Sequence, residues 1–151
     1  MEHYFSRLQN AIRLYWEKPA VGNYKGETFS YGQLATQIER FHIFFEACGI
    51  KKGERIAICA KNTARMAVSF LSVNTYETVV VPILSDFTPD CVNHLVDPSE
   101  SVILFTDNDI WAKLDISKMP LLRAVVSVND FTLLYAAEES ISKAFASVPE
   151  L

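Results

Sequence analysis

One segment, residues 49–63, restricts the fold of this 151-residue chain more than any other. It contains Gly49 and Gly53, and glycine readily adopts the left-handed backbone of helix ends and tight turns. Residues 56–59, Ile-Ala-Ile-Cys, form an apolar run of the length of a buried strand. The Asn-Thr pair that closes the segment supplies side-chain oxygens that can cap a helix. The segment therefore predicts a helix end, a tight turn, a buried strand and the start of another helix.

Beyond residue 55, apolar runs alternate with segments of helical periodicity. The predicted strands cover residues 56–59, 78–83, 102–106 and 122–128, and the predicted helices cover residues 64–76, 89–96, 108–114 and 131–147. Strands that are apolar at every position are typical of a parallel sheet covered on both faces. Before this half, the spacing predicts a helix over residues 4–16, a β-hairpin with strands 20–24 and 27–31, and a long helix over 34–48.

These patterns predict an α/β fold with a mainly parallel sheet and helices on both faces, preceded by a helix and a β-hairpin. We expect residues 1–151 to form a single partial domain. Residues 1–54 hold the helix, hairpin and long helix, and residues 55–151 hold the alternating half.

The positions of the glycines argue against a phosphate-binding loop. All five glycines lie at or before Gly53, so the alternating half contains none. Dinucleotide and P-loop sites need glycine after a strand so that backbone N–H groups can approach phosphate. This half therefore predicts a scaffold without a nucleotide-binding loop.

Composition excludes several classes. The net charge of −4 argues against a nucleic-acid partner, which requires a basic face. The three cysteines, Cys48, Cys59 and Cys91, lack metal-ligand spacing and are expected to be buried, reduced thiols. The N-terminus does not resemble a signal peptide, and no apolar run has the length of a membrane span, so we expect a cytoplasmic location.

The residues that could carry chemistry each have a simpler structural explanation. His42 borders the apolar stripe of the long helix and is expected to be a hydrogen-bonded helix residue. His94 is expected to be solvated, and His3 to lie at a frayed terminus. Cys59, in a buried strand, is expected to be inert.

The remaining candidates are two acidic residues, a lysine pair and the tryptophans. The run 107–109, Asp-Asn-Asp, follows a strand and predicts a helix cap rather than a metal site. Lys51 and Lys52 are expected to be solubilising, and Trp16 and Trp111 to be packing residues. We therefore assign no catalytic, cofactor-binding or metal-binding residue from the sequence.

Several segments, taken in order, resemble one enzyme family. They are residues 28–34 (TFSYGQL), 49–62 (GIKKGERIAICAKN), 70–73 (FLSV), 79–83 (VVVPI), 88–90 (TPD), 95–99 (LVDPS) and 102–105 (VILF). Over residues 27–107 the chain resembles the N-terminal part of the adenylate-forming, or AMP-binding, enzymes. These include acyl-CoA synthetases, adenylation domains of peptide synthetases, and luciferases. The chain departs from the family pattern at Glu77, where glycine is usual, and at Arg65-Met66, where Glu-Trp is usual.

The resemblance implies a parent enzyme that uses ATP and Mg²⁺ to convert a carboxylic acid into an acyl-adenylate, and then transfers the acyl group to coenzyme A. Residues 81–83 with 88–89 are most similar to the long-chain fatty-acid CoA ligases. The family's catalytic motifs are a Ser/Thr/Gly-rich loop ending in lysine, a Thr-Glu pair, and later Asp, Arg and Lys residues. None of these motifs lies within residues 1–151, so no catalytic residue is transferred.

The 151 residues alone are therefore expected to be inactive and to bind none of these cofactors. Their expected partners are the remainder of the same polypeptide and a carboxylic acid, expected to be a fatty acid. Self-association is a further expectation. Peripheral membrane association of the parent is left open.

Two alternatives also stay open. The parent could be an adenylation domain for an amino or aryl acid, or the chain could be a non-enzymatic α/β interaction module. A reading frame continuing into a Ser/Thr/Gly-rich segment with lysine would favour an enzyme, and a stop codon would favour the module.

Overall fold

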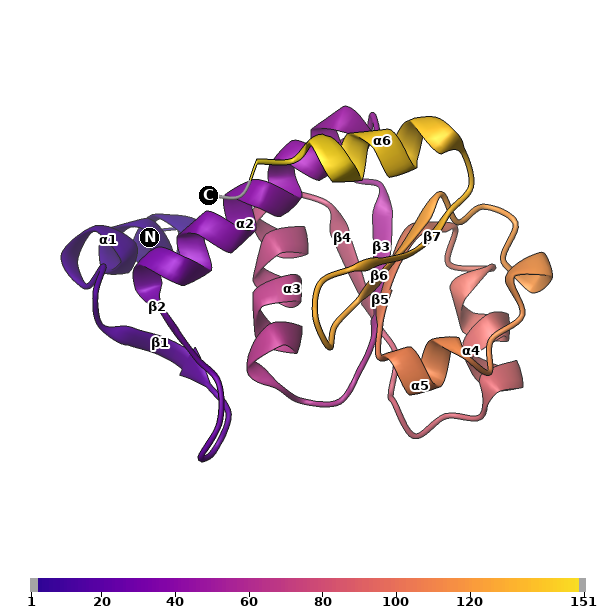
Figure 1. Ribbon diagram of the computed structural model, residues 1–151, viewed down its shortest axis with the longest axis horizontal. Coiled ribbons are helices and arrows are strands. Elements are labelled where there is room, and N and C mark those ends of the chain that lie inside the picture. Colours follow the sequence, from indigo (N-terminus) through magenta and orange to yellow (C-terminus); the bar gives the residue numbers. More distant parts are fainter. Residues whose placement is uncertain (1–2, 150–151) are drawn as a thin grey trace.

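A five-stranded sheet with helices on both faces forms the centre of the molecule (Figure 1). The computed structural model describes residues 3–149. The strands, in sequence order, are β3 (Arg55–Cys59), β4 (Val79–Pro82), β5 (Ser101–Thr106), β6 (Ala124–Ser127) and β7 (Leu133–Ala136). Their spatial order is β4-β3-β5-β6-β7. All neighbouring strands are parallel except β7, which is antiparallel to β6, and the predicted fold class is therefore confirmed.

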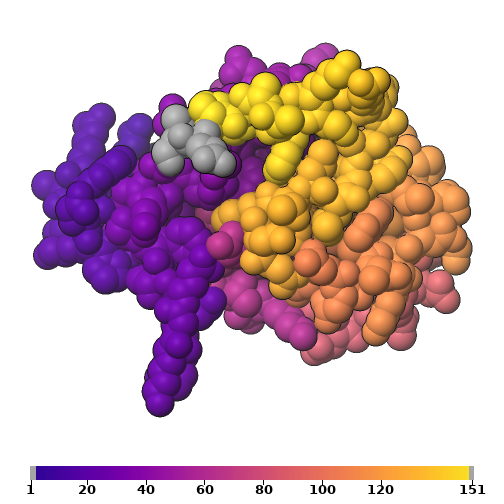
Figure 2. Space-filling view, in the orientation of Figure 1, coloured from indigo at the N-terminus to yellow at the C-terminus, as the bar shows by residue number. Residues whose placement is uncertain are grey.

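Helices cover the two faces of this sheet unequally. One face packs against α2 (Tyr31–Ala47), α3 (Ala64–Thr75) and α6 (Glu139–Ser147). The other packs against α4 (Pro89–Val96), α5 (Asn108–Trp111) and the 3₁₀ turn η1 (Ile116–Lys118). Outside these layers, α1 (Tyr4–Leu14) contacts α2. Strands β1 (Pro19–Gly22) and β2 (Thr28–Ser30) form a hairpin whose tip projects as a narrow arm (Figure 2).

The alternation of side chains along β5 explains why both faces must be covered. Ile103 and Phe105 belong to the core under α2, whereas Leu104 belongs to the core under α4. All three are fully buried. The Phe105 ring lies edge-on to Phe41 of α2, with 5.2 Å between centroids, and to Phe45 at 6.2 Å. An aromatic cluster therefore fixes the long helix on the sheet.

Side-chain caps and glycines in the sequence determine where the helices and strands begin and end. The Ser30 side chain accepts a hydrogen bond from the backbone of Gln33 while Gln33 bonds back to Ser30, a capping box that starts α2. Thr63 caps α3 in the predicted way. Gly49 and Gly53 have φ of +71° and +83°, which confirms the tight turn that feeds β3. The prediction that the second hairpin strand extends to residue 31 is wrong, because the capping box begins the helix there.

The prediction of one helix over residues 131–147 is also wrong. Residues 133–136 form β7, and α6 begins only at Glu139. If the segment were one continuous helix, the backbone groups on the outer edge of β6 would be buried without partners. Pairing of β7 with β6 satisfies them. Ala137 N–H donates to Arg123 O at 2.8 Å, and Ser127 N–H donates to Thr132 O at 2.8 Å. This tertiary pairing outweighs the helical periodicity of the segment.

The other end of the sheet is limited by a proline. The N–H groups of Val79 and Ile83 point to β3. The backbone groups of Val80 and Pro82 therefore point to the open edge of the sheet. Pro82 has no N–H, which removes one donor from the open edge. Large apolar side chains near this edge are nonetheless exposed, namely Phe70, Val79, Leu84 and Phe87. Self-association of the chain stays a prediction, and this surface is where we expect it.

None of the helices within residues 3–149 has the length and apolar content needed to span a bilayer.

The aromatic cluster predicts a large effect of one core substitution. Phe45 is fully buried and contacts the rings of Phe41, Tyr76 and Phe105. Phe45→Ala should lower the free energy of unfolding by about 3–5 kcal/mol, because it removes apolar contacts and leaves a cavity. Urea denaturation followed by circular dichroism measures this change. Phe70→Ala, at a half-exposed position, is the matched control, and an equal loss in both variants would contradict the assignment of the core.

Candidate functional site

The order of the strands identifies where a ligand site would be expected. From β3 the chain passes to β4 on one side and then to β5 on the other, so the strand order reverses between β3 and β5. Open parallel sheets bind ligands in the crevice outside the carboxyl ends of the strands at such a reversal. In this molecule Ala60 and Lys61 follow β3, and Asp107 follows β5. These residues border the crevice.

The side chain of Asp107 bridges the two loops that border this crevice. Its carboxylate oxygen Oδ2 accepts a hydrogen bond from the Lys61 backbone N–H at 2.9 Å. The residue is only 4% exposed. Next to it, the Thr106 hydroxyl donates to Cys59 O at 2.7 Å. The Asp107 carboxylate therefore links the loops after β3 and β5 by a hydrogen bond. It lies at the place where parallel sheets that bind nucleotides hold a phosphate.

The sequence predicted that Asp107 caps the following helix, but the side-chain hydrogen bond expected of such a cap is absent. Asp107 occupies the N-cap position of α5 but makes no side-chain hydrogen bond to that helix. Instead, the backbone N–H of Asn108 donates to Asn129 Oδ1 at 2.7 Å. The Asp107 carboxylate accepts from the Lys61 N–H instead, and so links the loop after β5 to the loop after β3.

This arrangement does not fit a nucleoside triphosphate with Mg²⁺. The carboxylate carries the same sign of charge as phosphate, and the two N–H groups at the crevice, on Lys61 and Asn108, already have acceptors. Lys61 Nζ lies 3.9 Å from Asp109 Oδ2, and both side chains are exposed. Within residues 3–149, no group of three His, Cys, Asp or Glu side chains could hold a metal ion.

Beside the crevice lies a mostly apolar cleft with a volume of about 510 Å³. It is bounded by the loops after β3 and β4 and by α3, with Met66, Phe70 and Leu84 among its lining residues. Lys61 and Asp86 also line it. The cleft has room for an apolar group but contains no activated nucleophile.

The thiol nearest this cleft, on Cys59, is buried as predicted. Burial, followed by the charge of Asp107, raises the pKa of Cys59 to about 11. The Cys59 thiol is also within 3.7 Å of Leu84 O, to which it donates a weak hydrogen bond. Cys48 is half-buried, and the prediction of burial is wrong for Cys91, which is exposed on α4.

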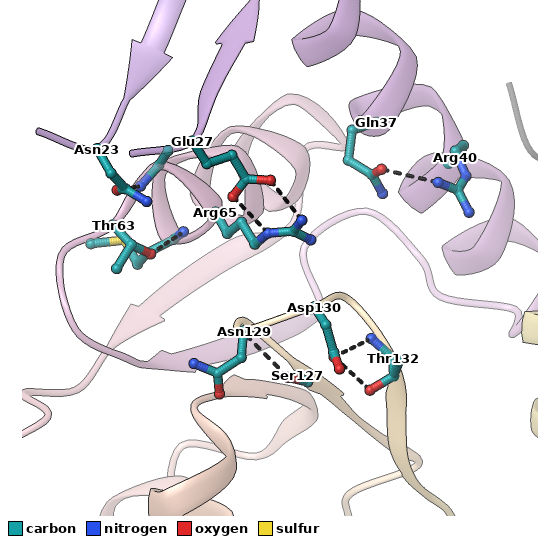
Figure 3. A network of polar contacts seen from close by, with 12 residues as sticks. Asn23, Glu27, Gln37, Arg40, Thr63, Arg65, Ser127, Asn129, Asp130 and Thr132 are labelled. Atoms are coloured by element: carbon teal, nitrogen blue, oxygen red, sulfur yellow. Dashed lines mark hydrogen bonds and ion pairs between the residues drawn. The ribbon is translucent and has the colours of Figure 1, made fainter. Parts of the chain in front are cut away.

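A polar network joins the projecting hairpin to the rest of the molecule (Figure 3). The Arg65 guanidinium in α3 donates two hydrogen bonds to the Glu27 carboxylate, at 2.9 and 2.7 Å. It also lies 4.7 Å from the ring centroid of Phe131. Asn23 Oδ1 accepts from the Ala64 N–H at 2.8 Å. Sequence reasoning noted Arg65 only as a departure from a family motif, since pairs between distant segments leave no local signal.

The turn that carries Phe131 is itself constrained. Phe131 has φ of +60°, an uncommon conformation for a bulky residue. The preceding Asp130 accepts hydrogen bonds from the Thr132 hydroxyl at 2.6 Å and from the Thr132 N–H at 3.1 Å. These bonds lower the pKa of the Asp130 carboxyl. The network therefore holds the β6–β7 turn against α3.

The histidines behave largely as predicted. His42 Nε2 lies 3.0 Å from both Ser72 O and Thr75 Oγ1, and burial lowers its pKa. The lowered pKa favours the neutral imidazole, and the Ser72 carbonyl requires that Nε2 be the donor. His94 is exposed. His3 has a definite role, because its Nδ1 accepts from the Phe5 N–H at the start of α1.

The lysine pair and the tryptophans are surface and packing residues. Lys52 forms an exposed ion pair with Glu77, and Lys51 is exposed. Trp111 lies 6.0 Å from the Tyr135 ring. Trp16 packs against Gly32, yet 49% of its surface stays exposed.

Comparisons with known proteins agree with one another. The sequence model of the AMP-binding enzyme family matches residues 8–149. Acetyl-coenzyme A synthetase of Desulfatibacillum aliphaticivorans is 29% identical over 101 residues, which cover 67% of this chain and 15% of that protein. Surfactin synthase subunit 2 of Bacillus subtilis is 24% identical over 103 residues, which cover 68% of this chain and 3% of that protein.

Solved structures show the same fold. An anthranilate CoA ligase in complex with anthranoyl-AMP aligns with a TM-score of 0.78 and 13% identity, over 95% of this chain and 27% of that one. A long-chain-fatty-acid-CoA ligase from Archaeoglobus fulgidus aligns with a TM-score of 0.75 and 16% identity, over 95% and 29%. The chain thus spans less than a third of these proteins.

The bond that closes the crevice should contribute measurably to stability. Asp107→Ala should lower the free energy of unfolding by about 1–3 kcal/mol, because it removes a hydrogen bond to a charged acceptor that links two loops. Asp107→Asn keeps an acceptor oxygen and should cost less. Urea denaturation of both variants measures the difference, and equal losses would show that the hydrogen bond is not the cause.

The raised pKa of Cys59 predicts its alkylation rate. The thiolate reacts with iodoacetamide, and a pKa of about 11 leaves almost no thiolate at neutral pH. In native protein Cys91 should be labelled first, and the rate at Cys59 should rise about tenfold per pH unit up to its pKa. Peptide mass spectrometry after timed labelling measures both rates. Fast labelling of Cys59 at neutral pH would refute the assignment.

Proposed function

The chain belongs to the AMP-binding enzyme family, and we propose from that premise that it forms part of the large domain of an ATP-dependent acid–thiol ligase. Such a ligase joins a carboxylic acid to the α-phosphate of ATP, releases pyrophosphate, and passes the acyl group from the adenylate to coenzyme A. In the proposal, residues 1–151 are one partial domain that supplies scaffold rather than catalytic groups.

The proposed scaffold role rests on the closed crevice between β3 and β5. Asp107 occupies the position where a parallel sheet would offer backbone N–H groups to phosphate. Phosphoryl transfer depends on positioning and on neutralisation of charge by Mg²⁺, lysine and backbone donors. Because the described residues bring no such group together, further polypeptide of the ligase supplies the grip on ATP and Mg²⁺.

Within the family, we favour a ligase that forms coenzyme A thioesters of long-chain fatty acids. Residues 81–83 and 88–89 support this choice by their resemblance to that branch. The names of several relatives support a coenzyme A acceptor. Besides the acetyl-coenzyme A synthetase, a 3-oxocholest-4-en-26-oate–CoA ligase of Rhodococcus rhodochrous is 22% identical over 127 residues.

An amino or aryl acid is the second candidate substrate class. The surfactin synthase relatives and the fold of the anthranilate CoA ligase favour it. Coupled assays of the complete ligase with palmitate, benzoate and leucine, each with and without coenzyme A, separate the classes. Thioester formation with palmitate alone supports the favoured proposal, and adenylation of leucine without thioester formation would overturn it.

The 151-residue chain should not catalyse acid-dependent exchange of pyrophosphate into ATP. The physical reason is that the crevice presents a carboxylate, not donors, to a triphosphate. Radiolabelled pyrophosphate exchange, measured with palmitate, benzoate and leucine, tests this expectation. Turnover that co-purifies with the chain through two chromatographic steps, and is lost in Asp107→Ala, would refute it.

A further inference from the structure

Helix α1 lies beside α2 without packing tightly against it (Figure 1). Phe5, Leu8 and Ile12 recur at spacings of three and four residues, so they share one face of α1. All three line a pocket of about 390 Å³ between the two helices, and no residue of α1 is buried. We call this space the α1–α2 pocket. Its volume lies within the range of small-molecule sites, roughly 300–1,000 Å³.

The α1–α2 pocket has an apolar wall and a polar mouth. Ala35 and Ile38 of α2 complete the apolar wall, and Ile38 is buried. Glu39 and His42 of α2 also line the pocket, beside Thr75 of α3. Glu39 is exposed, which places the polar residues where the pocket opens to solvent. A ligand with one apolar end and one polar end therefore matches the pocket.

The lining of the pocket carries one sign of charge. Glu39 is its only acidic residue, and no lysine or arginine among residues 3–149 lines it. No basic side chain of the described residues forms an ion pair with Glu39. The neighbouring Arg40 donates to Gln37 instead. The pocket therefore favours a cation at its mouth and disfavours a carboxylate.

His42 adds a second acceptor next to that carboxylate. Its Nε2 must donate to Ser72 O, because a carbonyl oxygen only accepts, and burial lowers its pKa and so favours the neutral ring. In this tautomer Nδ1 is an acceptor, and no donor within residues 3–149 reaches it. Nδ1 is open to solvent, because Arg40 Nε is the only side-chain nitrogen or oxygen of these residues that is both buried and unpartnered. A ligand at the mouth can therefore donate to it.

The ammonium group of an alkylamine fits this pair of acceptors. Its N–H donors match the Glu39 carboxylate and the His42 Nδ1 atom, and its chain matches the apolar wall. The charged head then lies at the mouth and the chain points inward. A lysine side chain of another protein has the opposite polarity, because its ammonium enters first and its backbone stays at the mouth. A free amine is therefore favoured over a protein partner.

We propose that the α1–α2 pocket binds a free primary alkylamine in its protonated form. The Glu39 carboxylate and His42 Nδ1 accept from the ammonium, and the alkyl chain packs between Leu8, Ile12 and Ile38. The bound chain supplies apolar contacts that α1 otherwise lacks, so binding fixes α1 on α2. The inference stands independently of the proposed ligase activity, whose acid substrate has the opposite charge.

Hexylamine is the probe, and NMR spectra of the ¹⁵N-labelled chain report its binding. At about pH 7 the amine is protonated, as a lysine side chain is. Amide signals of Leu8, Ile12, Ala35 and Ile38 should shift saturably, with a dissociation constant in the millimolar range. Hexanoate, of equal chain length, should bind at least about tenfold more weakly, because it meets a like charge.

Three results of this titration would overturn the proposal. They are the absence of saturable shifts up to about 20 mM hexylamine, binding of hexanoate as tight as that of hexylamine, and binding of 1-hexanol as tight as that of hexylamine. Tighter binding of Nα-acetyl-lysine methylamide than of hexylamine would overturn the assignment to a free amine.

Two substitutions separate charge from space. Glu39→Gln keeps the shape of the side chain and should weaken hexylamine binding about fivefold, with little effect on 1-hexanol. Glu46→Gln, at an exposed acid of α2 outside the pocket, is the matched control and should bind like the parent. Ala35→Leu fills the apolar part and should abolish binding of both compounds. Parent-like hexylamine binding by Glu39→Gln would contradict the role of charge.

Hydrogen exchange gives a readout of α1 itself. Since α1 buries no residue, its amides should exchange through local opening in the free chain. Hexylamine at ten times its dissociation constant should slow exchange in residues 8–13 by about tenfold, because opening of α1 releases the ligand. Unchanged exchange in these residues, or equal slowing by hexanoate, would contradict binding between α1 and α2.

Discussion

A single hydrogen bond, from the Lys61 N–H to the Asp107 carboxylate, determines how this sheet is finished at its carboxyl edge. The strand order reverses between β3 and β5, and such a reversal opens a crevice that other parallel sheets use for phosphate. Here the crevice holds a side chain of the protein itself. The two loops are joined, the N–H groups of Lys61 and Asn108 have acceptors, and the bridging group is a carboxylate. The sheet is therefore complete as a scaffold and unsuited to a triphosphate.

The rest of the structure supports that scaffold. Aromatic side chains of α2 pack on β5 from one face, and α4 with η1 closes the other. Arg65 then joins α3 to the hairpin through Glu27 and to the β6–β7 turn through Phe131. Polar and aromatic contacts thus connect segments far apart in sequence. Two surfaces stay uncovered, namely the edge of β4 and the groove between Trp16 and Arg40.

The sequence predicted the parallel part of the fold well, because its strands are apolar throughout and Gly49 and Gly53 mark the turn that leads into β3. It failed at residues 131–138, where the need to pair the edge of β6 outweighed helical periodicity. Glu77 is instructive in another way. It replaces a glycine usual in the family and has φ of +64°, so the glycine is explained by backbone conformation. The contacts of Asp107 and Arg65 were not predictable, since each depends on residues brought together only by folding.

Titration of the ¹⁵N-labelled chain with Mg²⁺-ATP, followed by amide NMR spectra, tests directly whether the crevice between β3 and β5 is closed to nucleotides. The amide signals of Lys61 and Asn108 should stay in place through millimolar nucleotide, because both donors are already bonded. Saturable shifts of these two signals, with slower exchange of neighbouring amides, would contradict it.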